Sequence, residues 1–250
     1  MELEKDKKIY FISDSHLGIP DKKNSLIREK KIVNFLDEIK KNAAELYLLG
    51  DIFDFWFEYK NVVPKGYVRL LGKLAELADN GIIIKYFTGN HDMWMLDYFE
   101  KELNIEIIRN PISMEYNGKK FYIAHGDGLG PADNGYKFLK FLFSCKTCRK
   151  LYSFIHPDWG IPVARYFSNK SRYSRKEEQF NSYNEKNERL IDYSKQLIEK
   201  ENYDFLIFGH RHLPVDIKIN NNVRYINIGD WLYHFSYLEF DGENIRLKFY

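Results

Sequence analysis

The chain has 250 residues, 44% of them hydrophobic and 30% charged, and its 38 Lys and Arg nearly balance its 36 Asp and Glu. This composition suits one domain with a full hydrophobic core, and a formal net charge of +2 gives no general reason to expect a nucleic acid as partner. The opening MELEKDKKIYF lacks an apolar signal segment, and no stretch approaches the ~20 apolar residues of a membrane span, so we expect a cytoplasmic protein.

The predicted strands share one pattern: a short apolar, β-rich run followed at once by a polar motif, usually with glycine. Runs of this length between turn residues are typical of buried strands. In chain order they are Lys8–Ser13 before Asp14-Ser15-His16, Glu45–Leu49 before Gly50-Asp51-Ile52-Phe53-Asp54, Ile82–Thr88 before Gly89-Asn90-His91-Asp92, Lys120–Ala124 before His125-Gly126-Asp127, and Phe205–Phe208 before Gly209-His210-Arg211-His212.

Helical periodicity separates the first three runs. Ser25–Lys41 and Val68–Leu77 both repeat apolar residues at intervals of three or four, which predicts amphipathic helices. Strands alternating with helices favour right-handed crossovers and a largely parallel sheet. Sites in such sheets collect beyond the carboxyl ends of the strands, where all five polar motifs are expected to lie.

The pattern stops after Asp127 and resumes near the C-terminus. Residues 128–201 are predicted to be helical and irregular. Further strands are expected at Val223–Ile228, before Gly229-Asp230-Trp231, and in a hairpin of Ser236–Phe240 and Ile245–Tyr250. We therefore predict a core of residues 1–127 and 202–250, with residues 128–201 inserted as a helical cap.

The chain contains two cysteines, Cys145 and Cys148. Such a pair supplies half of a zinc site or a redox-active dithiol, but no second pair exists to complete a zinc site. We interpret both as reduced residues of a helical segment.

Seven side chains of the five motifs are candidate metal ligands. Alternation in an extended segment places residues two apart on the same side, so Asp14 and His16, like His210 and His212, should each point at one location. Imidazole, carboxylate and amide oxygen together suit manganese, iron or zinc. Each motif alone also fits a turn or a hydrogen-bonded histidine, but five in series favour two ions bridged by Asp51. The seven are Asp14, His16, Asp51, Asn90, His125, His210 and His212.

The order DxH, GDxxD, GNHD, HGD and GHxH resembles the calcineurin-like metallophosphoesterase superfamily over nearly the whole chain. This resemblance implies an α/β (α+β) fold, a four-layer αββα sandwich of two sheets between helices, with two metal ions at one edge. It implies that one ion is held by Asp14, His16, Asp51 and His212, and the other by Asp51, Asn90, His125 and His210.

The resemblance also implies a reaction. Two ions roughly 3.5–4 Å apart can clamp a phosphate and activate a water for in-line attack on phosphorus. His91 is the candidate catalytic residue that stabilises charge or protonates the leaving oxygen, and Asp54 is expected to orient it. The alternative for Asp54 is a turn or capping residue.

Within the superfamily, SDSHLG, HGDGLGPADNGY and NIGDW are similar to the UDP-2,3-diacylglucosamine diphosphatases of lipid A biosynthesis, which release UMP and lipid X (2,3-diacylglucosamine 1-phosphate). The implied substrate contacts are Asp133 and Tyr136, with Asn90, His91 and His210 near the diphosphate. The rivals are an enzyme for another nucleotide or lipid diphosphate, and a non-catalytic scaffold, which would have lost ligands.

The predicted cap is apolar and basic. The stretches Tyr136–Phe143 and Leu151–Tyr166 suit acyl chains or docking on an anionic inner-membrane surface, although ordinary packing between cap helices explains them as well. A basic run from Arg165 to Lys176, including Arg172 and Arg175, is expected to bind phosphate; the alternative is a solvated face.

Overall fold

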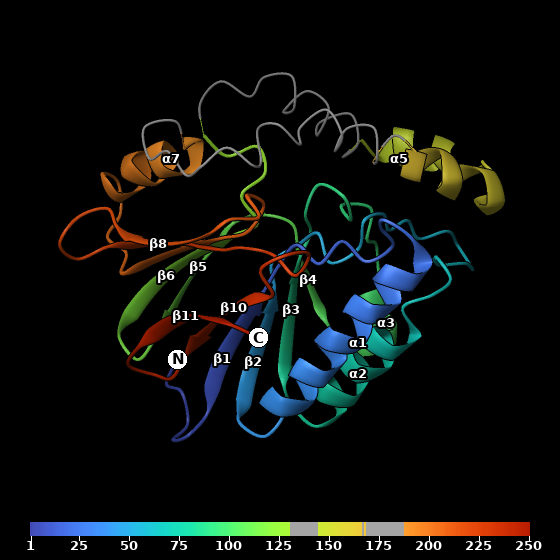
Figure 1. Ribbon diagram of the computed structural model, residues 1–250. Coiled ribbons are helices and arrows are strands. Elements are labelled where there is room, and N and C mark those ends of the chain that lie inside the picture. The colour runs from blue at the N-terminus through green and yellow to red at the C-terminus, as the bar shows by residue number, and fades with distance from the viewer. Residues whose placement is uncertain (131–144, 167, 169–187) are drawn as a thin grey trace.

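Two β-sheets packed face to face form the centre of the protein, in a computed structural model that describes residues 1–130, 145–166, 168 and 188–250 (Figure 1). The first sheet contains β1 (Lys8–Ile12), β2 (Ala43–Leu48), β3 (Ile83–Phe87), β4 (Glu106–Ile108), β10 (Ser236–Phe240) and β11 (Ile245–Phe249), in the order β11-β10-β1-β2-β3-β4. The second contains β5 (Ile112–Tyr116), β6 (Lys119–Ala124), β7 (Phe205–Phe208), β8 (Pro214–Lys218) and β9 (Arg224–Ile228), in the order β5-β6-β7-β9-β8.

The central strands of each sheet are parallel. β1 to β4 run in one direction, with β10 and β11 added antiparallel, and β6, β7 and β9 form the parallel centre of the second sheet. The predicted strands are confirmed to within a few residues. β4, β5 and β8 were not predicted, because β4 has three residues, β5 is half exposed, and β8 begins with a proline.

Helices cover the outer faces of both sheets, which confirms the predicted four-layer fold. On the first sheet lie α1 (Lys22–Ile39), α2 (Val68–Asp79) and α3 (Tyr98–Leu103), whose apolar residues join one core cluster with the strands. The second sheet is covered by α7 (Arg189–Ile198), whose Leu190 and Ile191 pack with Leu206 and Phe208.

Alternate residues of strand β1 face different layers of the fold. Ile9 and Phe11 face the space between the sheets, whereas Tyr10 and Ile12 face the helices. Both faces are therefore buried, and the strand reads as a continuous apolar run instead of an alternating one.

The described part of the predicted cap contains α7, which packs on the second sheet, and, earlier in the chain, α5 (Lys146–Tyr152) and a helical stretch at residues 157–166. Tyr152 anchors α5 to the core: its ring lies 4.6 Å from that of Phe57 and 4.9 Å from that of Trp94, measured between centroids. Cys145 is the residue immediately before α5, Cys148 lies within the helix, and neither cysteine is in a disulfide. Among the described helices, none has the length and apolar character needed to cross a bilayer.

Candidate metal centre

The polar turns after β1, β2 and β7 have an unusual backbone conformation. Five of the seven candidate ligands have a positive φ: Asp14 (54°), His16 (40°), Asp51 (54°), His210 (68°) and His212 (56°). Non-glycine residues rarely adopt this conformation, and such residues concentrate at functional sites. The turns hold one another in place, since Asp14 N–H donates to the Gly50 carbonyl and His16 N–H to the Asp51 carbonyl, at 3.1 and 2.9 Å.

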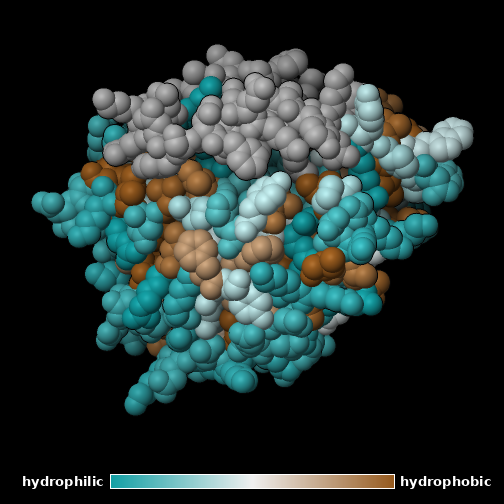
Figure 2. Space-filling model, in the orientation of Figure 1, coloured by the Kyte–Doolittle hydropathy of each residue, from teal (hydrophilic) through white to brown (hydrophobic). Residues whose placement is uncertain are grey.

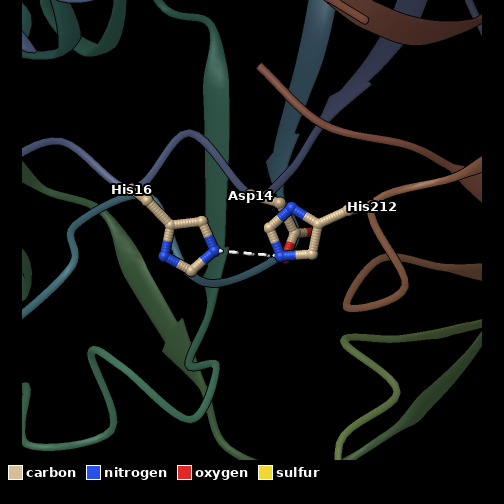
Figure 3. Close-up of side chains that lie close together, drawn as sticks. All are labelled: Asp14, His16 and His212. Carbon is tan, nitrogen blue, oxygen red and sulfur yellow. Dashed lines mark hydrogen bonds and ion pairs between the residues drawn. The ribbon is translucent and has the colours of Figure 1, made fainter. Parts of the chain in front are cut away.

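The first cluster of potential ligand atoms consists of Asp14, His16 and His212 (Figure 3). The Nε2 atoms of the two imidazoles lie 3.2 Å apart, and Asp14 Oδ1 lies 3.7 Å from His16 Nε2 and 3.4 Å from His212 Nε2. Asp14 is anchored through its other oxygen, which accepts from Ser13 Oγ and from the His210 N–H at 2.8 Å. One carboxylate oxygen and two ring nitrogens thus converge.

The second cluster consists of Asp51, His125 and His210. Asp51 Oδ2 lies 3.4 Å from His125 Nε2 and 3.8 Å from His16 Nε2, so this carboxylate lies between the two clusters. The expectation that His210 and His212 point at one location was wrong. The two rings belong to different clusters, whereas Asp14 and His16, which also have positive φ angles, share one.

Three of the histidines turn Nδ1 away from the clusters and toward an oxygen acceptor. His16 Nδ1 lies 3.6 Å from Asp54 Oδ1, His125 Nδ1 lies 2.6 Å from the Leu49 carbonyl, and His212 Nδ1 lies 3.3 Å from Asp230 Oδ2. An acceptor at Nδ1 favours the tautomer that leaves a lone pair on Nε2, which is how metal-binding histidines are usually oriented.

Three polar atoms at this place are buried and form no hydrogen bond with the described residues: Asp14 Oδ1, Asn90 Oδ1 and His125 Nε2. Leaving such atoms without a partner costs about 1–3 kcal/mol each. A divalent cation bound by these oxygens and nitrogens would remove that cost, so the residues present fit a metal centre.

Charges within the site shift its pKa values strongly. Burial lowers the pKa of His125, but the neighbouring Asp51 outweighs this effect and raises it to about 10. Burial, together with His125, lowers the pKa of His210 to about 3. Burial raises the pKa of Asp14, but His212 and His16 reverse this and lower it to about 2. The carboxylate of Asp14 therefore stays ionised at neutral pH.

His91 and Asp54 lie together beside the first cluster. His91 Nδ1 lies 3.1 Å from the Asp54 carbonyl and 3.5 Å from Asp54 Oδ1, and the His91 ring meets that of His16 edge-on, 4.8 Å between centroids. His91 N–H donates to Asp51 Oδ1 at 2.8 Å. Ser168 reaches this pair from the cap, with Oγ 2.9 Å from His91 Nδ1.

The remaining predicted substrate contacts, Asp133, Tyr136, Arg172 and Arg175, lie outside the described residues and stay predictions.

Asp92 is a buried residue of the GNHD motif to which the sequence assigned no role. Its carboxylate accepts from Tyr86 Oη at 2.6 Å, Gly89 N–H at 2.8 Å and Ile52 N–H at 2.9 Å, and so ties the turns after β2 and β3 together. Burial and the charge of Asp51 raise its pKa to about 6. Its place in the motif was visible in the sequence, but these partners were not.

Gly89 lies against the candidate bridging residue. A Cβ at this position would overlap the Asp51 carboxylate and would stand 2.7 Å from the Asp51 backbone nitrogen. The glycine of the GNHD motif is therefore required for the close approach of the two turns.

Comparison with known proteins gives consistent results. Residues 7–214 match the model of the calcineurin-like phosphoesterase family. A UDP-2,3-diacylglucosamine hydrolase of Porphyromonas gingivalis is 39% identical over 96% of this chain and 97% of its own length. The protein of the same name from Tolumonas auensis is 27% identical over 95% and 94%. Among solved structures, the phosphoesterase Yfce of E. coli aligns over 95% of this chain and 90% of its own, at 17% identity and a TM-score of 0.46.

Proposed function

The chain belongs to the calcineurin-like phosphoesterase family, and on this premise we propose that it hydrolyses the diphosphate of UDP-2,3-diacylglucosamine, giving UMP and 2,3-diacylglucosamine 1-phosphate in lipid A biosynthesis. Water adds to one phosphorus, the bridging P–O bond breaks, and each product keeps one phosphate. The observation that carries the proposal is the similarity to a hydrolase of that name over almost the full length of both chains.

We propose that the centre holds two divalent ions, with manganese as the native metal. Asp14, His16 and His212 would hold one ion, and Asn90, His125 and His210 the other, with Asp51 shared between them. When bound, the ions supply the charge that activates a water and neutralises the phosphate oxygens. The orphaned Asp14 Oδ1, Asn90 Oδ1 and His125 Nε2 support this assignment.

His91 is the proposed catalytic residue among the groups that hold no metal. Its side chain is 16% exposed, which suits a group that meets substrate. Asp54 contacts His91 Nδ1 through its carbonyl and faces it with its carboxylate, so Nε2 is the ring nitrogen that we propose to face the diphosphate. There it would donate a proton to the leaving oxygen or stabilise charge on phosphate.

Residues 128–201 are proposed to form the inserted cap over this site, and the contact of Ser168 with His91 supports that position. The described part of this segment exposes apolar and basic side chains. Large hydrophobic side chains are exposed there, including Phe154 (75%) and Trp159 (74%). Figure 2 shows hydrophobic surface beside hydrophilic surface at the upper right, where α5 lies in the same orientation in Figure 1. The adjoining α5 carries Lys146, Arg149 and Lys150 and no acidic residue.

This combination of apolar and basic groups fits transient docking on the anionic cytoplasmic face of the inner membrane, where the acylated substrate resides.

The test is hydrolysis of UDP-2,3-diacylglucosamine by metal-stripped protein reloaded with Mn²⁺, with both products measured by mass spectrometry. Asp51→Asn removes the shared carboxylate charge and should abolish turnover. The matched control is Asp79→Asn, which removes an exposed charge at the end of α2 and should leave turnover unchanged.

Two other outcomes are informative. Cleavage of a nitrophenyl phosphodiester without cleavage of the lipid would keep the two-metal reaction and reject the substrate. Failure to cleave either compound after reloading with manganese, iron or zinc would reject the proposed activity.

A further inference from the structure

The turn after β9 contains none of the predicted ligands, yet it contacts both turns that carry the first cluster. The Trp231 N–H donates to the carbonyl of Asp14 at 3.2 Å. Near the end of β9 itself, the Asn227 side chain donates to the carbonyl of Gly209, next to His210, at 2.6 Å. Asp230 Oδ2 lies 3.3 Å from His212 Nδ1. The end of β9 and the turn after it thus contact both the ligand turn after β1 and the ligand turn after β7.

The carboxylate of Asp230 is buried and fixed from both sides. Its Oδ1 accepts from the N–H groups of Tyr233 and His234, at 3.0 and 2.9 Å, and lies 3.2 Å from His234 Nδ1. These contacts leave Oδ2 directed at His212.

We propose that Asp230 is a positioning residue of the metal centre, which keeps the proton of His212 on Nδ1 and so directs the Nε2 lone pair at Asp14 and His16. The inference rests on the proposed two-metal function. The comparison among the histidines supports it: His125 meets a neutral carbonyl at Nδ1, whereas His212 meets a carboxylate, which is the stronger acceptor. Partners of this kind typically change metal affinity 10–100-fold.

The first experiment is calorimetric titration of metal-stripped protein with Mn²⁺. Asp230→Asn keeps the shape and the turn-capping oxygen but removes the charge, so one of the two sites should weaken about 10–100-fold while the other keeps its affinity. Asp241→Asn is the matched control. Asp241 also caps a turn, accepting from Glu243 and Asn244 N–H at 3.1 and 2.7 Å, and its loss should change neither site.

Wild-type affinity at both sites of Asp230→Asn would overturn the proposal, and so would equal weakening of both. A double-mutant cycle separates positioning from a general structural role: in a His212→Ala background, Asp230→Asn should weaken metal binding no further. A full additional loss there would also overturn it.

If Asp230→Asn does not fold, the nitrogen NMR shifts of His212 in the metal-free wild-type protein decide the question. A proton on Nδ1 is expected, and a proton on Nε2 alone would refute the role of Asp230. Wild-type protein that binds two Mn²⁺ but cleaves no UDP-2,3-diacylglucosamine would reject the substrate and leave this inference standing. Wild-type protein that binds no Mn²⁺ would reject both.

Discussion

The rings of His16 and His212 are stacked, 4.9 Å between centroids and 12° from parallel, with their Nε2 atoms 3.2 Å apart although 196 residues separate them in the chain (Figure 3). A cation bound between the two rings would take the lone pair of each Nε2 atom. Because the two rings lie so close together, replacing one of them tests whether both bind the same ion.

His16→Ala should weaken Mn²⁺ binding by about a hundredfold or more, because it removes a ring that faces Asp14, Asp51 and His212 at once. Equilibrium dialysis with metal analysis measures the change. His156→Ala, at an exposed histidine of the cap, serves as the control and should keep both ions. Full metal occupancy of His16→Ala at micromolar Mn²⁺ would contradict the assignment of His16 as a ligand.

His91→Asn should lower kcat by about 10²–10⁴-fold, the usual contribution of a general acid, while the metal content stays at the wild-type value. The two effects separate because the His91 side chain contacts Asp54 and Ser168, neither of which is a proposed ligand. Steady-state kinetics and metal analysis of the same preparation check this. A variant that loses its metal together with its activity would argue for a ligand role instead.

Gly89→Ala should destabilise the protein and impair metal binding, because the new methyl group overlaps the Asp51 carboxylate. Gly72→Ala is the matched control in α2: a Cβ there meets nothing within 4 Å, so the substitution should stabilise the helix by about 0.4–1 kcal/mol. Thermal unfolding should shift in opposite directions for the two variants. Equal shifts would show that the close approach at Gly89 carries no special cost.

Lys85→Met should lower the free energy of unfolding by about 3–5 kcal/mol, because it leaves Glu45 buried without its cation. Lys85 Nζ lies 2.8 Å from Glu45 Oε2, which also accepts from Tyr116 Oη at 2.7 Å. Lys101→Met removes an exposed ion pair with Asp97 and should cost less than about 1 kcal/mol. Urea denaturation compares the two, and a similar loss in both would contradict the structural role of the buried pair.

Replacing Phe154 and Trp159 by serine should weaken binding to vesicles that contain anionic phospholipid by about tenfold or more, since full burial of one such side chain contributes roughly 1.5–3 kcal/mol. Cosedimentation measures this, and cleavage of a soluble nitrophenyl phosphodiester should be unaffected. Ile27→Ser is the control, at an exposed apolar residue of α1 (58%). Unchanged vesicle binding of the double variant would reject this face as the docking surface.

The sequence predicted the elements whose signal is local. The runs before Asp14, Asp51 and Asn90 are apolar on both faces because they are covered on both sides, and a polar motif marks the carboxyl end of each. Strand β8 has no comparable signal, because it begins with a proline and its residues are partly exposed.

Relationships that depend on the tertiary fold escaped prediction. Asp14, His16, His210 and His212 all have positive φ angles, which no residue pattern encodes, and their spacing alone did not place His210 and His212 in different clusters. The contact between Asp230 and His212 joins residues 18 positions apart, and it exists only because β7 and β9 are paired neighbours.

Asp14 contacts the C-terminal part of the chain, and these contacts bear on when the metal centre can form during synthesis. Its carboxylate accepts from the N–H of His210 and its carbonyl from that of Trp231, so the first ligand acquires its native surroundings only from the last fifth of the chain. A nascent polypeptide still lacking those residues has the first candidate ligands but no enclosed centre. We therefore expect metal binding at this centre to follow synthesis of these residues, and a chain that ends before His210 to bind metal weakly.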